Sequence, residues 1–264
     1  MPRLKLTLAY EGTRYAGWQI QAAAFPTVQG VLEEAVARIA GCRVPVHAAG
    51  RTDAGVHAEA QACHLDPPEN RIDLDWRQAL NAALPPDIRI LAADPVSPSF
   101  HAQRDARGKV YAYSLWLGRQ GPLPRIRAFV WHTAELDLPR LDEASRLLEG
   151  RRDFASFRNA RAARGPTLRT LQAIRREPGR LGPLLCPTDW PVMTFFFEAD
   201  GFLKQMVRNL MGFLVFVGRG KLPPSSAADI LAAGDRRALP SPTAPAQGLT
   251  LMRVLYDPGP KESA

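Results

Sequence analysis

The sequence predicts an α+β fold made of two halves. Two observations carry this prediction: the first half reads strand, helix, strand, strand, helix, strand, and the second half has a similar order of elements. Strands that follow one another without a helix between them favour antiparallel sheets with helices on one face. We place the division after residue 105, which gives an N-terminal half, 1–105, and a C-terminal half, 106–264.

Hydrophobic spacing predicts each element of the first half. Residues 4–10 alternate and are rich in Leu, Thr and Tyr, which is typical of a strand. Residues 28–40 carry apolar side chains at helical spacing, and Asp75 stands near the start of a second helix. In chain order we expect strands at 4–10, 44–48, 60–65 and 88–92 and helices at 28–40 and 74–84.

The second half follows the same rules. Its strongest strand pattern is at 110–117, and its longest helical pattern is the apolar segment 202–217. The sequence PSPTAP at 240–245 predicts a loop. We expect strands at 110–117, 171–176, 192–199 and 249–255 and helices at 142–148, 202–217 and 227–233.

The composition is that of an ordinary globular protein. Hydrophobic residues make up 46% and charged residues 23%, which excludes a disordered tail, a collagen-like fibre and a disulfide-rich miniprotein. The three cysteines are far apart and form no CxxC pair, so a reducing compartment fits. The start has no secretory pattern, and the longest apolar run, 210–217, is too short for a membrane span. We therefore expect a cytoplasmic protein without membrane association.

The charge favours an acidic partner. The net charge is +8, which is typical of proteins that bind nucleic acid or an anionic surface. The chain has 29 arginines and 5 lysines; genomic base composition explains this bias as well as function does. Location is more informative, because residues 151–180 hold nine arginines and only two acids, Asp153 and Glu177. This stretch favours a phosphate-binding surface over a merely solvated one.

Ten residues between two expected strands, 49–58 (AGRTDAGVHA), form the most unusual segment. They bring Arg51, Asp53 and His57 onto one loop, with glycines that let the backbone turn sharply or approach a ligand. One interpretation is a simple turn, since Asp-x-Gly sequences are common in turns. The other makes Asp53 a nucleophile or base, because a carboxylate can attack carbon covalently. An ionised carboxylate then needs a nearby cation, and the sequence leaves both Arg51 and Arg208 open for that role.

The segment GRTDAGVHA at 50–58 closely resembles the signature of the tRNA pseudouridine synthase A family. Further segments resemble this family in the same order, and together they span about residues 4 to 256. They are YAGWQ at 15–19, VQGVLE at 28–33, FHA at 100–102, DFASF at 153–157, MVRN at 206–209 and GLTL at 248–251. One such motif would be weak, but seven in order are specific.

The resemblance implies an isomerase that converts uridine to pseudouridine at positions 38, 39 and 40 of the tRNA anticodon stem-loop. It implies two ferredoxin-like halves whose antiparallel sheets join into one larger sheet, with helices on one face and a basic catalytic cleft between the halves. It also implies a homodimer that binds tRNA and needs no cofactor and no metal. The last point agrees with the chemistry, since the reaction only moves the C1′ bond from N1 to C5 of the base.

Three residues carry the implied chemistry. Asp53 matches the family's catalytic aspartate, which attacks either the uracil ring or the ribose. Tyr111 matches a tyrosine that contacts the substrate, where the ring can stack on uracil and the hydroxyl can handle a proton; a strand-core tyrosine is the alternative. Arg208 matches the arginine that pairs with the aspartate and keeps it ionised.

Four further residues match positions that contact RNA. Arg51 matches the arginine that fills the space left by the flipped nucleotide, and flipping is required because C5 and C1′ are inaccessible in a stacked stem. Leu249 is expected to pack on the uracil face, with ordinary core packing as the alternative. Arg71 and Arg119 fall where the family uses basic residues on tRNA, although solvated surface arginines would look the same.

Some features depart from the family, and two other functions are alternatives. Related sequences often carry Arg where this chain has Gln103, and a basic residue where it has Val110. A non-catalytic RNA-binding protein would leave the intact Asp53, Arg208 and Tyr111 unexplained. An Asp-dependent hydrolase would need a second acid or a carboxylate cluster, which the neighbourhood of Asp53 lacks in sequence. The histidines are dispersed, so zinc ligation is not expected.

Overall fold

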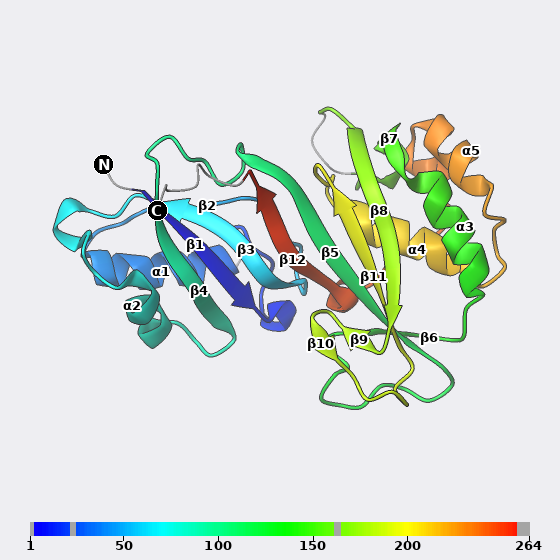
Figure 1. The fold of residues 1–264 in the computed structure, drawn as a ribbon, viewed down its shortest axis with the longest axis horizontal. Coiled ribbons are helices and arrows are strands. Elements are labelled where there is room, and N and C mark those ends of the chain that lie inside the picture. Colours follow the sequence, from blue (N-terminus) through cyan, green and yellow to red (C-terminus); the bar gives the residue numbers. More distant parts are fainter. Residues whose placement is uncertain (1–2, 22–24, 161–164, 258–264) are drawn as a thin grey trace, which may run out of the picture. The chain divides into compact units, whose positions relative to one another are not determined.

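The computed structural model describes residues 3–21, 25–160 and 165–257 (Figure 1). The chain forms two compact units. The first contains the chain up to Arg107 and takes in Leu251 and the strand residues that follow it; the second contains Gly108–Thr250. None of the described helices is long and apolar enough to cross a membrane. Each unit is described in turn.

The sheet of the first unit is antiparallel and has β1 (Arg3–Tyr10) near its centre. β1 lies between β3 (His57–Leu65) and the edge strand β4 (Ile88–Val96). The side chains of β1 alternate between buried and half-buried, so one face of this strand forms the core. Beyond β3 come the short β2 (His47–Ala48) and the part of β12 (Leu249–Tyr256) that belongs to this unit.

Two helices complete the first unit. α1 (Val28–Ala40) begins where the Thr27 hydroxyl accepts a hydrogen bond from Gly30 N at 3.2 Å, and it ends at Gly41, whose φ is +75°. α2 (Trp76–Ala83) is capped by Asp75, as the sequence predicts. Both helices bury apolar side chains on one stripe, which is why the helical spacing located them.

The sheet of the second unit follows the order β5, β11, β8, β7, and all these pairs are antiparallel. The strands are β5 (Ala106–Leu117), β7 (Gly150–Asp153), β8 (Leu168–Pro178) and β11 (Val192–Ala199). β6 (Trp131–Thr133) pairs with β5 in parallel, and β9 (Arg180–Leu181) with β10 (Leu184–Leu185) forms a separate hairpin.

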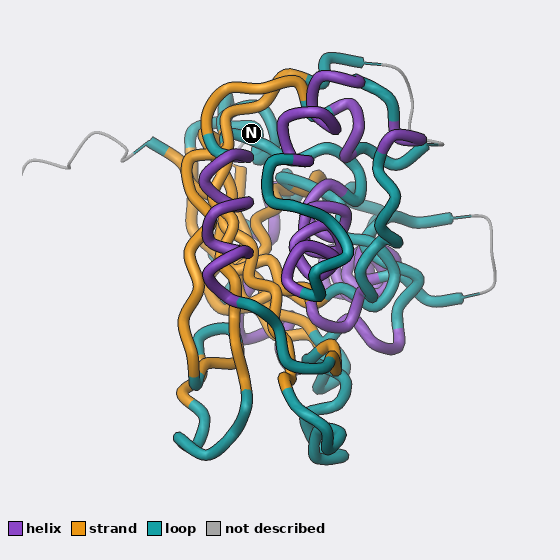
Figure 2. Tube along the Cα trace, turned by 90° about the vertical axis from the view of Figure 1, so that its right-hand side faces the viewer, coloured by secondary structure: helices purple, strands orange, loops and turns teal. Residues whose placement is uncertain are grey.

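The helices of the second unit are α3 (Leu138–Leu148), α4 (Met206–Gly218) and α5 (Ser226–Ala233). Figure 1 shows α4 behind β8 and β11, and Figure 2 distinguishes helices from strands by colour. α4 is buried on nearly all sides, and Gly212 lets it pack directly against the carbonyl of Pro242. A side chain at Gly212 would collide with that carbonyl, so the loop containing Pro242 is fixed against this helix.

The predicted α+β class is confirmed. Several elements differ in extent from the expectation. The largest shortenings are in the strand expected at 44–48, of which only His47–Ala48 is paired, and in the helix expected from 202, which begins at Met206. The later start has a local cause, because Gln205 has φ +61° and interrupts a helical path. The parallel β5–β6 pairing is a departure from purely antiparallel sheets.

Candidate active site

The loop that carries Asp53 is held by main-chain hydrogen bonds at both ends. Ala49 N donates to Ala62 O at 2.8 Å where the loop leaves β2. Trp18 N donates to Thr52 O at 3.0 Å, one residue before the aspartate. Val56 N then donates to Asp53 O at 3.1 Å and closes a tight turn. The main chain around Asp53 is therefore fixed before any substrate binds.

Two glycines allow the neighbouring segment to approach this loop closely. Gly17 has φ +93°, and a Cβ added there would lie 2.7 Å from Thr52 O and 3.1 Å from the carbonyl carbon of Asp53. A Cβ at Gly12 would collide with the main chain of Val56. The contacts explain why the YAGWQ motif has glycine at this position, because no larger residue fits between this segment and the aspartate loop.

Buried polar groups brace the loop from below. The hydroxyls of Tyr10 and Thr52 are 2.8 Å apart and both residues are buried. Burial raises the pKa of Tyr10, so its hydroxyl stays protonated. Gln61 Nε2 donates to Gly50 O at 2.8 Å, and Gly12 N donates to His57 Nδ1 at 3.1 Å. His57, which the sequence placed on the same loop as Asp53, is therefore a buried brace whose Nδ1 carries no proton.

The side chains of the loop differ in exposure. Asp53 is half-buried, whereas Arg51 is exposed and makes no hydrogen bond or ion pair with the rest of the described chain. A carboxylate on a rigid loop, partly open to solvent, is arranged as a nucleophile or base has to be. The exposed guanidinium of Arg51 is available to a ligand.

In the second unit, two tyrosines on β5 point to the same side of the strand but have different surroundings. The ring of Tyr111 meets the ring of Phe202 edge to face, with centroids 5.2 Å apart. The hydroxyl of Tyr113 donates to Pro245 O at 2.7 Å, and its ring lies against Gly248. Burial raises the pKa of Tyr113. Tyr113 thus has a structural role in fixing the segment that precedes Leu249.

Arg208 is tied to that same segment. It lies in the first turn of α4, and its Nε donates to Ala244 O at 2.8 Å while Ala244 N donates to its carbonyl at 3.1 Å. Next to it, the Thr243 hydroxyl donates to Asn209 Oδ1 at 2.7 Å. The Nε bond restrains the plane of the guanidinium, whose terminal nitrogens carry further N–H donors. Leu249, which follows Gly248, is buried at the start of β12.

Comparisons with known proteins identify the family of this chain. A family model described as tRNA pseudouridine synthase matches residues 7–104 and 144–257. The chain belongs to this family. A tRNA pseudouridine synthase A from Nitratidesulfovibrio vulgaris strain Miyazaki F is 50% identical over 278 residues, covering 97% of this chain and all of the relative. One from Lawsonia intracellularis is 50% identical over 260 residues, with 97% and 100% covered. One from Geobacillus kaustophilus is 40% identical over 256 residues, with 97% and 95% covered.

A solved structure titled as a Cbf5–Nop10–Gar1 complex overlaps with 80% of this chain and 45% of its own, with a TM-score of 0.37 and 12% identity, and it adds nothing to the assignment. As a tRNA pseudouridine synthase, the chain is an isomerase that forms pseudouridine in tRNA. The candidate catalytic and RNA-binding residues are divided between the two units. Arg51, Asp53 and Arg71 belong to the first, and Tyr111, Arg119, Arg208 and Leu249 belong to the second.

The arginines expected to bind tRNA differ in whether they are paired with acidic side chains in this pseudouridine synthase. Arg71, in the short 3-10 helix Glu69–Arg71, and Arg119, after β5, are both exposed. In the basic stretch 151–180, Arg176 forms a bidentate ion pair with Asp142, with N–O distances of 2.7 and 2.8 Å. Arg175 and Arg180 pair with Glu198 and Glu177. The net charge of this stretch therefore overstates its free positive charge, while Arg161 and Arg164 lie outside the described residues.

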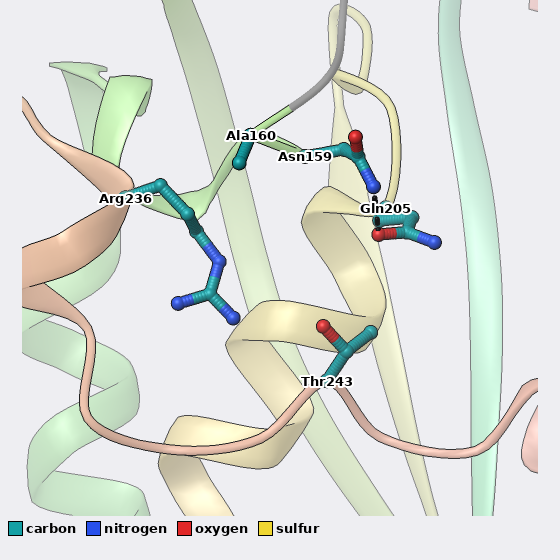
Figure 3. Close-up of a pocket in the computed structure, with 5 residues that line it drawn as sticks. All are labelled: Asn159, Ala160, Gln205, Arg236 and Thr243. Carbon is teal, nitrogen blue, oxygen red and sulfur yellow. Dashed lines mark hydrogen bonds between the residues drawn. The ribbon is translucent and has the colours of Figure 1, made fainter.

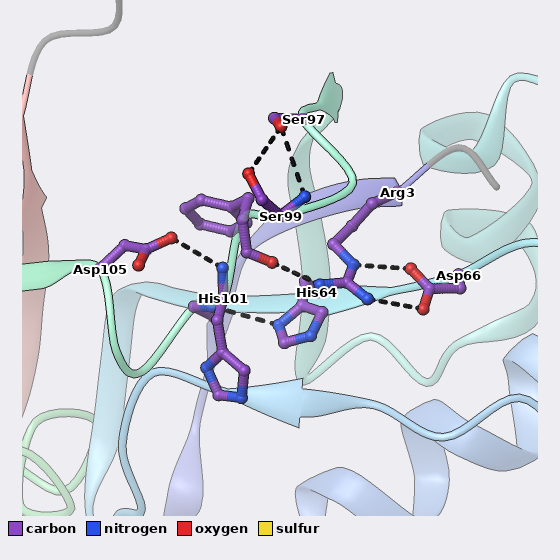
Figure 4. A network of polar contacts seen from close by, with 9 residues as sticks. Arg3, His64, Asp66, Ser97, Ser99, His101 and Asp105 are labelled. Atoms are coloured by element: carbon purple, nitrogen blue, oxygen red, sulfur yellow. Dashed lines mark hydrogen bonds and ion pairs between the residues drawn. The ribbon is translucent and has the colours of Figure 1, made fainter.

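The structure also gathers three histidines that are distant in sequence, His47, His64 and His101. Figure 4 shows His64 and His101. The rings of His47 and His64 stack with centroids 5.0 Å apart, and His101 lies 4.8 Å from His64. His64 is buried, and its Nδ1 accepts a hydrogen bond from Ala102 N at 3.2 Å. Among residues 3–21, 25–160 and 165–257, no group of three histidine, cysteine or acidic residues is arranged to hold a metal ion. No spacing rule in the sequence would have located this cluster, because it depends on how β2 and β3 pair.

Proposed function

We propose that the enzyme isomerises uridines at positions 38, 39 and 40 of the tRNA anticodon stem-loop, with Asp53 as the nucleophile. The proposal rests on the family membership and on the match of GRTDAGVHA to the family signature. The observation that carries it is the bracing of the Asp53 loop by Trp18, Gly17 and Tyr10. A loop that served only as a turn would not require such close packing of main chain on both sides.

The proposed reaction conserves atoms and electrons without a second reactant. Asp53 forms a covalent bond to the target nucleotide, either at the ring or at the ribose, and the bond between C1′ and N1 breaks. The base then rotates and C5 bonds to C1′. The C5 proton leaves to solvent, N1 gains a proton, and Asp53 is released unchanged. No electron or group is transferred to another molecule, so the residues of the chain suffice for the chemistry.

The other candidates have supporting roles in this proposal. Arg208 keeps the Asp53 carboxylate ionised, and its orientation depends on the carbonyl of Ala244. Tyr111 contacts the uracil and handles a proton, with its ring fixed by Phe202. Arg51 fills the space that the flipped nucleotide leaves, which suits its exposure. Leu249 packs on the uracil face.

The remaining expectations of the family complete the proposal. Arg71 and Arg119 contact the tRNA away from the reacting nucleotide, and both are exposed enough to do so. The enzyme acts as a homodimer in the cytoplasm, where its tRNA substrates are. Neither Gln103 nor Val110 replaces a catalytic candidate, so these departures bear on tRNA contacts and leave the chemistry unchanged.

The experiment is tritium release from tRNA labelled at C5 of uridine. Wild-type protein is compared with Asp53→Asn and with Asp73→Asn, which alters an exposed aspartate in the same unit. Wild type and Asp73→Asn should release tritium, whereas Asp53→Asn should bind tRNA and release none. Substrates with a single uridine at 38, 39 or 40 then test each position. Release by Asp53→Asn at the wild-type rate would exclude Asp53 as the nucleophile.

A further inference from the structure

A recess in the second unit is lined by side chains that the proposed chemistry does not use. Its volume is about 370 Å³, and Asn159, Ala160, Gln205, Arg236 and Thr243 line it (Figure 3). The lining supplies a guanidinium, two amides and a hydroxyl, with no carboxylate. Such a lining favours an anionic ligand over a cationic or apolar one.

Arg236 provides the charge. Figure 3 shows its guanidinium directed into the space above Thr243. The guanidinium makes one hydrogen bond within the described chain, from Nη1 to Leu239 O at 2.9 Å, which orients it and leaves its other donors for a ligand. The adjacent carboxylate of Asp235 is bound to Arg237 instead, at 2.6 and 2.9 Å. Partial burial lowers the pKa of Arg236, and an anion in the recess would compensate the desolvated charge.

The opposite wall is rigid. Gln205 has φ +61°, the only positive φ of a non-glycine residue among those described. Its side-chain oxygen accepts a hydrogen bond from Asn159 Nδ2, and Asn159 N donates to Lys204 O at 2.9 Å. A strained residue persists only where its surroundings determine it, and such residues cluster at ligand sites. The amides therefore hold fixed positions across the recess from Arg236.

The recess shares a segment with the active-site arginine. Thr243 lines the recess and donates to Asn209, while the next residue, Ala244, is bonded in both directions to Arg208. A group bound in the recess thus lies beside the first turn of α4, on which Arg208 is placed. The ligand that would reach this position in a tRNA-modifying enzyme is the RNA backbone near the reacting nucleotide.

We propose that this recess binds one phosphodiester group of the tRNA, with Arg236 as its charged ligand. The inference rests on the proposed function, because it takes Arg208 to act at the target nucleotide. Arginine suits the role, since its planar fork matches two phosphate oxygens. The amide of Gln205 and the hydroxyl of Thr243 border the same space. This contact fixes the register of the backbone and leaves the chemical step to other residues.

The first test is binding of an anticodon stem-loop RNA to Arg236→Gln and Arg237→Gln at several salt concentrations. The two variants remove the same charge from neighbouring positions, but the Arg237 side chain is 91% exposed and bonded to Asp235. Arg236→Gln should bind the RNA about 10-fold more weakly. The slope of its log binding constant against log salt concentration should become shallower by about one phosphate contact. Arg237→Gln should stay within about 2-fold of wild type. Equal losses in both variants would overturn the proposal.

The second test alters the RNA and needs no altered protein. A methylphosphonate linkage, which removes the charge of one phosphate, is placed in turn at each position near the target uridine. One linkage should weaken wild-type binding by about 10-fold and have no further effect on Arg236→Gln. If wild type still binds the RNA more tightly than Arg236→Gln with every single linkage, the recess does not bind a phosphodiester. Binding is measured without turnover, so loss of tritium release by the wild type would count against the proposed function alone.

Discussion

The hydroxyl of Tyr10, on the central strand of the first unit, lies 2.8 Å from the hydroxyl of Thr52, the residue before Asp53. Both residues are buried, so neither hydroxyl can turn to water instead. The bond connects the end of β1 to the loop that carries the proposed nucleophile. It gives the loop a fixed position at its base, while Gly17 packs against its side.

This bond predicts a measurable coupling between the two residues. Tyr10→Phe and Thr52→Val should each lower the free energy of unfolding by about 1–3 kcal/mol, because each removes the hydrogen bond between two buried hydroxyls. The double variant should lose less than the sum of the two, by about 1 kcal/mol. Urea unfolding of the four proteins measures this difference. Strictly additive losses would mean that the hydroxyls do not interact.

The close approach of Gly17 predicts an effect on catalysis rather than on binding. Gly17→Ala places a methyl group 2.7 Å from Thr52 O and must displace the Asp53 loop. A shift of about 1 Å in a catalytic group costs about 100-fold in kcat, whereas tRNA affinity should change little. Steady-state tritium release and filter binding separate the two quantities.

Gly41→Ala is the matched control for this variant. Gly41 also has a positive φ, +75°, but a methyl group there would meet nothing within 4 Å. It therefore carries a similar backbone strain at the end of α1 without touching the loop. We expect lowered stability with normal kcat. Equal kcat values for Gly17→Ala and Gly41→Ala would show that the loop tolerates the displacement.

The histidine cluster predicts a loss of stability in mild acid. Burial is the main cause that lowers the pKa of His64 from its ordinary value of 6.5 to about 4, and the nearby charge of Arg3 adds to it (Figure 4). The rings of His47 and His101 act in the same direction, and Asp66 opposes them. Between pH 6.5 and 4 the unfolded chain binds a proton here that the folded chain does not. The contribution of neutral His64 to the free energy of unfolding is therefore complete above pH 6.5 and is lost as the pH falls toward 4.

The variant that tests this is His64→Asn, which keeps an acceptor near the amide of Ala102 but does not titrate. The wild type should lose on the order of 1 kcal/mol more than the variant between pH 7 and pH 4, since solvent screens part of the effect. Thermal unfolding at several pH values measures how the stability of each protein depends on pH. The same pH dependence in wild type and His64→Asn would show that another group causes the acid sensitivity.

The elements that the sequence located well carry their own local signals. The apolar spacing of 28–40 predicts α1 with its observed bounds, and in the structure Thr27 and Gly41 cap its two ends. β7 was missed because its four residues are all exposed and have no alternation to detect. The pairing of β6 with β5 was missed for a similar reason, since three residues are too few to show a period.

The candidate site divides in the same way. Asp53 could be identified from its loop sequence, whereas the contacts that brace it come from Tyr10 and Gly17 and depend on tertiary structure. The role of Gly17 is visible only when Thr52 is placed beside it. The left-handed conformation of Gln205 was equally hidden, because glutamine carries no preference for it.

The bond from Arg208 Nε to Ala244 O predicts that lysine cannot replace this arginine. A lysine ammonium keeps the charge, but it cannot bind the carbonyl of Ala244 and present a two-nitrogen edge at the same time. We expect Arg208→Lys to lower kcat by about 100-fold, with Arg208→Gln lower still because it also loses the charge. Arg219→Lys, at the other end of α4, is the control, since that arginine bonds to Thr133 instead. Tritium release at saturating tRNA gives kcat directly. If Arg208→Lys keeps the wild-type kcat, charge alone is sufficient and the orientation set by Ala244 has no part in the reaction.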